Sequence, residues 1–379
     1  VKNKMQCAMM APTEILAVQH AQTLKSMLSP AGIRIELLTG STPKSEKRRI
    51  KEALIDGNTD LVIGTHAIIQ NDVEFHKLGL VITDEQHRFG VDQRANLAMK
   101  GNEPNTLVMS ATPIPRTLAL MIYGDLDISV LDELPPGRQT VRTDVVDSRY
   151  HKRIYAFIKK QIEAGNRAYI VCPLVEESES ENMISAEKYA EELANGAFRG
   201  INIGLLHGKM KPAQKENVMQ AFADGDIKLL VATTVIEVGV DVPEATVMVV
   251  ENAERFGLSQ LHQLRGRVGR GKEQAYCILV SDSKSDTAAE RLQTMKKYCD
   301  GFKIADVDLK LRGPGDFFGN RQHGLPDLKI ADMLEDMDTL KKCRQCADRI
   351  LAEDYALDMP KYKALANHIS DMFRNSVSN

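Results

Sequence analysis

The feature that most limits the fold of this chain is the alternation of short apolar runs with segments of helical periodicity. The runs of the first third are Cys7–Met10, Ile33–Leu38, Leu61–Ile63, Leu80–Thr83 and Thr106–Met109. A second series follows: Tyr169–Val171, Ile203–Leu206, Leu229–Ala232, Val247–Val250 and Ala275–Val280. Strands that alternate with helices form parallel sheets, and near-continuous apolar strands are buried on both faces. The sequence therefore predicts an α/β fold with two parallel-sheet domains in tandem.

Turn-forming residues and a change of texture divide the chain into three parts. The turn-rich segment Leu134–Arg138 separates the two series, so we expect a first domain at residues 1–138 and a second at 139–285. Residues 286–379 contain a glycine-rich loop at Arg312–Gly324, and the amphipathic stretch from Pro326 onward predicts a helical C-terminal region.

Composition excludes several classes of protein. The net charge of -3 gives no overall positive charge of the kind that favours binding to nucleic acid. No apolar run approaches the length of a membrane span, and six cysteines in 379 residues are typical of a reducing cytosol. We therefore expect a cytoplasmic protein without membrane contact.

Two adjacent carboxylates follow one of the predicted buried strands. Asp84 and Glu85 come directly after Leu80–Thr83, at the strand end where open α/β sheets bind ligands. Asp84 is predicted to hold Mg²⁺ through water, and Glu85 to orient or deprotonate an attacking water. Taken alone, an Asp-Glu pair is more often a helix cap. The neighbouring Gln86-His87 and the motifs below favour the catalytic interpretation.

Hydroxyl residues follow other predicted strands. Ser110 and Thr112 come after Thr106–Met109, where they are expected to couple the carboxylate site to movement. The alternative is that they cap a helix started by Pro113 or Pro115.

Thr233 and Thr234 lie in the segment Val231–Asp241 and are predicted to bind a DNA phosphate. In the same segment Gly239 and Asp241 are expected to approach the nucleotide. The alternative for all four is a turn from strand to helix.

Two further hydroxyls give weaker signals. Thr13 and Thr65 each stand shortly after a predicted strand, where a helix N-terminus can take a strand phosphate. Either one alone would be interpreted as an ordinary loop residue.

Three arginines share a framework of small glycines in the segment Gln260–Gly271. Arg265, Arg267 and Arg270 stand within a dozen residues there. Guanidinium groups on closely approaching backbone can grip phosphate oxygens through two hydrogen bonds at once. The segment therefore indicates a phosphate-binding function.

Taken in order, these segments resemble motifs Ia to VI of superfamily 2 helicases over residues 6–325. The residues that carry the resemblance are Ala11-Pro-Thr-Glu, Thr39-Gly, Gly64-Thr-His, Asp84-Glu-Gln-His, Ser110-Ala-Thr, Ala232-Thr-Thr, Gly239-Val-Asp and Gln263 to Arg270. Longer strings are similar to the RecG family: Asp84 to Gly90, Ser110 to Ala119, Tyr123 to Leu126 and Asp308 to Gln322. The resemblance implies two RecA-like domains.

The resemblance also assigns roles to individual residues. Gln263, Arg267 and Arg270 would face the nucleotide, the two arginines acting as fingers on the γ-phosphate. His87 would join Ser110 and Thr112 in coupling chemistry to movement.

The segment Arg312–Gly324 resembles the translocation element of the family. Arg312, Arg321 and Gln322 would transmit motion there. The chain departs from the expected pattern at Asn320 and His323, where Thr and Ser would be expected.

The implied function is ATP-driven, Mg²⁺-dependent translocation on double-stranded DNA that remodels stalled replication forks and branched intermediates such as Holliday junctions. The DNA would be contacted through its backbone phosphates, by a monomer in the bacterial cytoplasm at the nucleoid. Single-stranded DNA-binding protein is a further implied partner. A transcription-repair coupling translocase is the rival within the enzyme class, since it shares the run that begins at Ser110.

One expected element is missing from the sequence. No Gly-x-x-x-x-Gly-Lys-Ser/Thr motif occurs, and Gly40 to Lys44 lacks the second glycine and the Gly-Lys pair. In the family this P-loop would fall just before Val1, preceded by a wedge domain, so we expect the chain to be the back portion of a motor that cannot turn over ATP alone. A non-catalytic DNA-binding remnant is the second alternative.

The pair Cys343 and Cys346 is interpreted as two thiols on one helix face. A structural Zn²⁺ site needs four ligands, and no second cysteine pair or nearby histidine accompanies them. The role of the two cysteines stays open.

Overall fold

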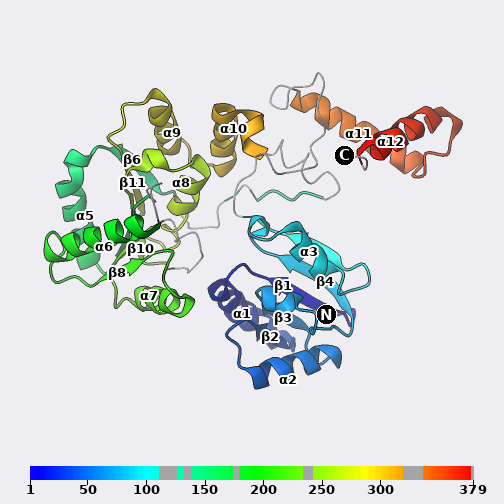
Figure 1. Ribbon diagram of the computed structural model, residues 1–379, viewed down its shortest axis with the longest axis horizontal. Helices are drawn as coiled ribbons and strands as arrows, with labels where there is room; N and C mark the ends of the chain where they lie inside the picture. The colour runs from blue at the N-terminus through cyan, green and yellow to red at the C-terminus, as the bar shows by residue number, and fades with distance from the viewer. Residues whose placement is uncertain are drawn as a thin grey trace. The chain divides into compact units, whose positions relative to one another are not determined.

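The computed structural model describes residues 1–110, 127–131, 133, 139–173, 179–233, 242–318 and 336–376. The chain forms two compact units, and Figure 1 labels the helices and strands along it. One comprises residues Val1–Pro113 and Leu131–Asp308 and contains both sheets, and the other comprises Ile114–Val130 and Leu309–Asn379. Each sheet is described below by itself.

The first sheet is parallel, as the apolar runs predict. Its strands are β1 (Gln6–Met10), β2 (Ile35–Leu38), β3 (Leu61–Gly64), β4 (Leu78–Thr83) and β5 (Asn105–Val108), in the order β2-β3-β1-β4-β5. The helices along this segment are α1 (Glu14–Leu28), α2 (Lys44–Ile55) and α3 (Val91–Ala98). The central strand β1 pairs with β3 and β4.

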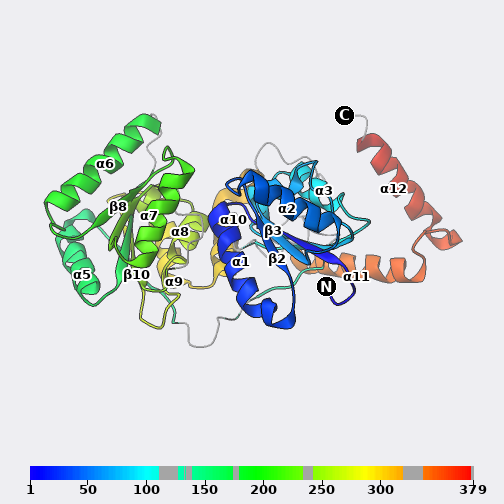
Figure 2. The same ribbon diagram turned by 90° about the horizontal axis from the view of Figure 1, so that it is seen from below.

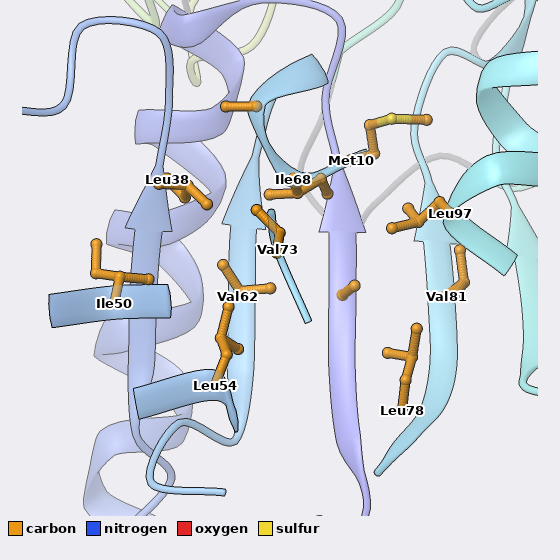
Figure 3. Close-up of a cluster of buried hydrophobic side chains, with 12 residues drawn as sticks. Met10, Leu38, Ile50, Leu54, Val62, Ile68, Val73, Leu78, Val81 and Leu97 are labelled. Atoms are coloured by element: carbon orange, nitrogen blue, oxygen red, sulfur yellow. The ribbon is translucent and has the colours of Figure 1, made fainter. Parts of the chain in front are cut away.

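Alternate side chains of these strands enter two different apolar layers. Figure 3 shows the layer beneath α2 and α3, whose members include Ala8, Met10, Val62 and Val81 of the sheet with Ile50, Leu54 and Leu97 of the helices. On the other face, Met9, Ala11 and Ile63 pack with Ala17 and Ala21 of α1. Successive strand residues point to opposite faces, so burial on both sides explains the uninterrupted apolar runs of the inner strands β1 and β3, at Cys7–Met10 and Leu61–Ile63.

Gly64 closes β3 where no side chain fits. A Cβ atom at this position would lie 2.0 Å from the carbonyl oxygen of Leu38 on the neighbouring strand. Glycine therefore lets β3 pair with β2 up to its last residue, which fixes the start of the loop at Thr65.

The second sheet is also parallel, and six of its strands lie in the described part of the chain. They are β6 (Arg142–Val146), β7 (Arg167–Val171), β8 (Ile203–Leu206), β9 (Leu229–Ala232), β10 (Ala245–Val250) and β11 (Tyr276–Val280), in the order β6-β11-β10-β7-β9-β8. Figure 2 shows α5 (His151–Glu163) and α6 (Glu179–Asn195) on one side of it, with α7 (Pro212–Asp224) and α8 (Leu258–Arg265) on the other. Helix α9 (Asp286–Lys297) follows β11.

The two sheets have the same topology apart from β6. The order β2-β3-β1-β4-β5 corresponds to β8-β9-β7-β10-β11, and β6 is added beyond β11. Within the described residues, β5 has no neighbour beyond it, and the side chain of Leu107 is 49% exposed there. The sequence did not predict β6, because Arg142, Thr143 and Asp144 interrupt its apolar pattern as edge strands permit.

The C-terminal region is helical, as predicted, with α10 (Gly301–Phe318), α11 (Met337–Glu353) and α12 (Lys363–Ser376). The loop predicted from Arg312 begins too early, because α10 runs on through Gly313 and Pro314 to Phe318. Burial of Ile304, Ala305 and Leu309 anchors the first turns of this helix, which offsets the hydrogen bond lost at a proline. None of the helices in the described part of the chain is long and apolar enough to cross a membrane.

Candidate functional site

The carboxyl ends of the first sheet gather five of the predicted site residues at one edge. Thr13 follows β1, Thr65 follows β3, Asp84 and Glu85 follow β4, and Ser110 follows β5. Backbone hydrogen bonds continue past the strands, from Asp84 N to Met10 O (3.0 Å) and from Gln86 N to Met109 O (3.2 Å). The carboxylate turn is therefore fixed to both neighbouring strands.

Asp84 is held by a histidine that sequence analysis missed. His20 Nε2 of α1 lies 2.8 Å from Asp84 Oδ2, and the backbone N–H of Glu85 donates to Asp84 Oδ1 at 2.9 Å. The Asp84 side chain keeps 19% of its surface exposed. Mg²⁺ is bound in proteins by one or two carboxylates together with waters and phosphates, so a partly exposed carboxylate at this edge fits the predicted ligand. Nothing local to His20 in the sequence reveals the contact, which spans 64 residues.

Glu85 occupies a strained backbone conformation. Its φ of 49° and ψ of 51° place it in the left-handed region, which costs a residue with a Cβ about 1–2 kcal/mol. Such strain persists where the surrounding structure imposes it and is concentrated at functional sites. Exposed Glu103 has the same φ of 49°, so what distinguishes Glu85 is that this conformation occurs at the carboxyl end of a buried strand.

The hydroxyls at this edge differ in their hydrogen bonding. Thr13 caps α1, because its side chain accepts from Leu16 N at 3.4 Å. The Thr65 hydroxyl is buried and has no hydrogen-bond partner among the described residues. Ser110 is exposed. His87 belongs to the 3-10 turn Gln86–Arg88 that follows Glu85, and Thr112 lies outside the described residues.

The second sheet repeats the buried threonine. Thr233 follows β9, the counterpart of β3, and its backbone N–H donates to Leu206 O at 3.1 Å. Its side-chain oxygen is likewise buried without a partner in the described part of the chain. Leaving a buried hydroxyl unpaired costs about 1–3 kcal/mol, so two such groups at equivalent strand ends call for a ligand or a neighbour. Thr234, Gly239 and Asp241 lie outside the described residues.

Arg265, the first of the three clustered arginines, has a structural role. It is 4% exposed, and its guanidinium donates to the carbonyl oxygens of Met295 (2.8 Å), Tyr298 (2.9 Å) and Cys299 (3.2 Å). These carbonyls stand at the end of α9 and just beyond it, where a cation is favoured. Burial lowers the pKa of Arg265 from its usual high value. The suggestion that all three arginines grip phosphate is therefore wrong for Arg265.

The remaining residues of this segment lie on α8 and directly after it. Gln263 is on the helix, Arg267 is partly buried and Arg270 is exposed. Gly269 has a φ of 76°, and a Cβ there would come within 2.9 Å of Val141 Cγ2. The chain can make this tight turn between the two arginines only with glycine.

One neighbour on α8 is a partly buried histidine. Burial, and secondly the charge of Arg265, lower the pKa of His262 to about 4, with Asp300 opposing. His262 is therefore neutral near pH 7 and adds no charge to the arginine segment.

The predicted coupling residues of the C-terminal region fall at the limit of the described structure. Arg312 lies on α10, while Arg321 and Gln322 lie outside the described residues. Cys343 and Cys346 are exposed thiols on α11.

The two parallel sheets, which share one strand order, have the fold of superfamily 2 helicases. Residues 1–121 match the DEAD/DEAH box helicase family and residues 151–272 the helicase conserved C-terminal domain. Residues 298–379 match the C-terminal part of domain 3 of the ATP-dependent DNA helicase RecG. The fold also matches S. cerevisiae Dbp5 bound to RNA and ADP BeF3, with a TM-score of 0.53 over 90% of this chain and 81% of that one, at 16% identity.

The particular family follows from nearer relatives. The chain is 52% identical to ATP-dependent DNA helicase RecG of Synechocystis sp. over 93% of its length, and 48% identical to that of Bacillus subtilis over 96%. A structure of RecG bound to a three-way DNA junction matches this chain with a TM-score of 0.73 at 49% identity. The match covers 89% of this chain and 44% of the RecG chain in that structure. The chain belongs to the RecG helicase family. It spans 42% and 53% of the lengths of these two relatives.

Replacing Glu85 by asparagine should relieve backbone strain. Asparagine tolerates the left-handed region far better than glutamate, so we expect Glu85→Asn to stabilise the first sheet by about 1 kcal/mol in urea unfolding. Glu103 has the same φ of 49° in an exposed turn and supplies the matched control, Glu103→Asn. A clear loss of stability in Glu85→Asn, with a gain in Glu103→Asn, would show that the Glu85 conformation carries no net strain.

Shortening Arg265 should destabilise the second sheet. A lysine ammonium cannot reach all three carbonyls, so Arg265→Lys should lower the free energy of unfolding by about 1.5–3 kcal/mol, the range for hydrogen bonds to a charged group. Arg270→Lys, an exposed control in the same segment, should change it by less than about 0.5 kcal/mol. Equal effects of the two substitutions in chemical denaturation would contradict the structural role of Arg265.

Proposed function

We propose that this chain is the motor portion of an ATP-driven translocase that moves on double-stranded DNA and remodels branched structures such as stalled forks. The observation that carries the proposal is the Asp84–Glu85 turn, which presents a strained glutamate beside a partly exposed aspartate. Relatives named as ATP-dependent DNA helicases, and one bound to a three-way DNA junction, support the choice of substrate. The match of residues 298–379 to RecG favours this role over transcription-repair coupling.

In this proposal the first sheet supplies the groups for hydrolysis. Asp84 holds Mg²⁺ through water, and His20 keeps the aspartate oriented through the contact at Oδ2. When bound, Mg²⁺ neutralises the charge of the nucleotide phosphates. Glu85 orients the attacking water and accepts its proton, since its carboxylate directly follows Asp84 on the turn held by backbone hydrogen bonds to the neighbouring strands. His87, Ser110 and Thr112 couple this chemistry to movement.

The second sheet supplies the groups that respond to the nucleotide. Gln263, Arg267 and Arg270 act on the γ-phosphate, with Gly239 and Asp241 approaching the rest of the nucleotide. Arg312, Arg321 and Gln322 transmit the resulting movement. We further propose that the protein works as a monomer and contacts single-stranded DNA-binding protein.

DNA is held through its backbone by hydroxyl groups. Thr65 and Thr233 have hydroxyls at equivalent strand ends that lack a partner among the described residues, and each would donate to a phosphate oxygen of its own. Thr13 and Thr234 extend the same contact in each domain. Binding of this kind reads no sequence, so affinity should depend on salt and on DNA shape.

ATP turnover provides the first test. The 379 residues contain no P-loop motif, so we propose that the chain alone binds DNA without DNA-stimulated ATP hydrolysis. In a longer chain that carries a P-loop ahead of these residues, Arg267→Ala or Arg270→Ala should lower kcat by about 10³–10⁵ if each acts as a finger. ATP hydrolysis by the 379-residue chain would contradict its proposed inactivity. A decrease in kcat of less than about tenfold would indicate that the substituted arginine has a structural role.

Threonine-to-valine substitutions provide the second test. Thr65→Val and Thr233→Val should each weaken binding to a DNA junction by roughly 2- to 10-fold, the worth of one hydrogen bond, with an unchanged salt slope. Both should leave thermal stability equal or higher, because an unpaired buried hydroxyl is removed. Thr246→Val is the control, since Thr246 is buried near the opposite end of β10 and donates to Gln161 Oε1. If both variants bind the DNA junction with unchanged affinity, these threonines do not contact DNA.

A further inference from the structure

The second sheet contains a turn with the same backbone course as the Asp84–Glu85 turn. Each turn follows the corresponding six-residue strand, β4 or β10, with an acidic residue first, Asp84 or Glu251. The next residue is left-handed in both, at φ 49° and ψ 51° for Glu85 and φ 47° and ψ 51° for Asn252. A 3-10 turn follows, and both end in the sequence Arg-Phe-Gly.

Backbone contacts of the two turns coincide as well. The N–H of Asp84 donates to Met10 O at the end of β1, and the N–H of Glu251 donates to Val171 O at the end of β7. A glutamine then caps the following helix in each copy, Gln93 accepting from Gly90 N at 3.2 Å and Gln260 from Gly257 N at 3.1 Å. The helices that follow are α3 and α8. The two turns are equivalent positions in a repeated fold.

The chemistry of the second copy differs at its second residue. Asn252 stands where Glu85 stands in the first copy. A side-chain amide cannot take up a proton from water as a carboxylate does. Asparagine also tolerates the left-handed conformation that glutamate resists. The second turn is therefore more relaxed and has lost the group that would act as a base.

The acidic residue of the second copy is enclosed by hydrogen bonds. His151 Nε2 lies 3.1 Å and 3.0 Å from the two carboxylate oxygens of Glu251, and the Tyr189 hydroxyl donates to Oε1 at 2.9 Å. The Tyr155 hydroxyl lies 2.9 Å from that of Tyr189. The Glu251 side chain is 11% exposed, against 19% for Asp84. Burial, and secondly the Glu251 charge, raise the pKa of Tyr189, which keeps its hydroxyl a donor.

These contacts join three elements at the turn that leads toward α8. His151 opens α5, Tyr189 lies on α6, and Glu251 directly follows β10. The chain then runs through Asn252 and the 3-10 turn Ala253–Arg255 into α8, which carries Gln263 and leads to Arg267. A fixed Glu251 thus fixes the point from which α8 departs.

We infer that Glu251 and Asn252 form a second, catalytically silent copy of the Asp84–Glu85 turn, in which Glu251 is a positioning residue for α8 and the arginines that follow it. Its carboxylate holds α5 and α6 to the sheet instead of binding a metal ion. The link from α8 to nucleotide chemistry rests on the proposed function, whereas the positioning of α8 does not.

Hydrogen exchange measured by mass spectrometry tests the positioning directly in the 379-residue protein. Glu251→Gln removes the charge and one acceptor, so amides of residues 252–265 should exchange at least about tenfold faster, as expected when a charge-assisted hydrogen bond is lost. Asp84→Asn makes the same change in the first copy and should leave these amides unchanged. Tyr155→Phe, which removes a hydroxyl that is hydrogen-bonded to Tyr189 and keeps the His151 and Tyr189 contacts of Glu251, should change their exchange less than about threefold.

Wild-type exchange across 252–265 in a folded Glu251→Gln protein would overturn the inference. If that variant does not fold, Tyr189→Phe removes a single donor, and unchanged exchange there would overturn the inference equally. In a longer chain that carries a P-loop, Glu251→Gln should lower kcat for ATP about tenfold with KM nearly unchanged, because displaced arginines act in the transition state. Absence of turnover in the unsubstituted longer chain would refute the proposed function and leave the exchange result to decide the positioning role.

Discussion

The shared direction of all strands within each sheet is the constraint on which the rest of the structure depends. Parallel strands bring every carboxyl end to one edge, so side chains far apart in sequence meet there. In the first sheet this places Thr13, Thr65 and Asp84 at a common edge, although 71 positions separate the first from the last (84 − 13). Backbone hydrogen bonds beyond the strand ends then hold the carboxylate turn. The candidate site is therefore positioned by the strand ends and the turns that follow them.

Apolar patterning was sufficient to predict the buried strands. A strand covered on both faces is apolar at successive positions, so it stands out in the sequence as a continuous run. The patterning failed for β6, whose edge position allows Arg142 and Asp144 in the strand. It also failed in α10, where Gly313 and Pro314 suggested a loop inside a helix. The residue types of the site were recognisable from local motifs, but the contact of His20 with Asp84 and the burial of Arg265 were not. Both depend on packing between elements distant in sequence, which periodicity does not encode.

Several ordinary rules of stability are broken at the residues assigned to function. Glu85 has a backbone conformation that suits asparagine better, and the hydroxyls of Thr65 and Thr233 are buried without a partner in the described chain. Natural proteins depart from such rules chiefly where function requires it. Arg265 shows the opposite case, since a residue type expected to bind ligand is instead satisfied by three carbonyl oxygens. The three carbonyl contacts thus identify Arg265 as a structural member of the arginine segment.

The strand order also determines when each sheet can form during synthesis. β6 is the first strand of the second sheet to leave the ribosome, yet it pairs only with β11, the last. Likewise β1 must wait for β3 and β4 before its backbone is paired on both sides. Pairings of such long range form slowly, and unpaired apolar strands are prone to aggregate in the interval. The topology that brings the strand ends to one edge therefore delays completion of the second sheet until Val280, the last residue of β11, has been added.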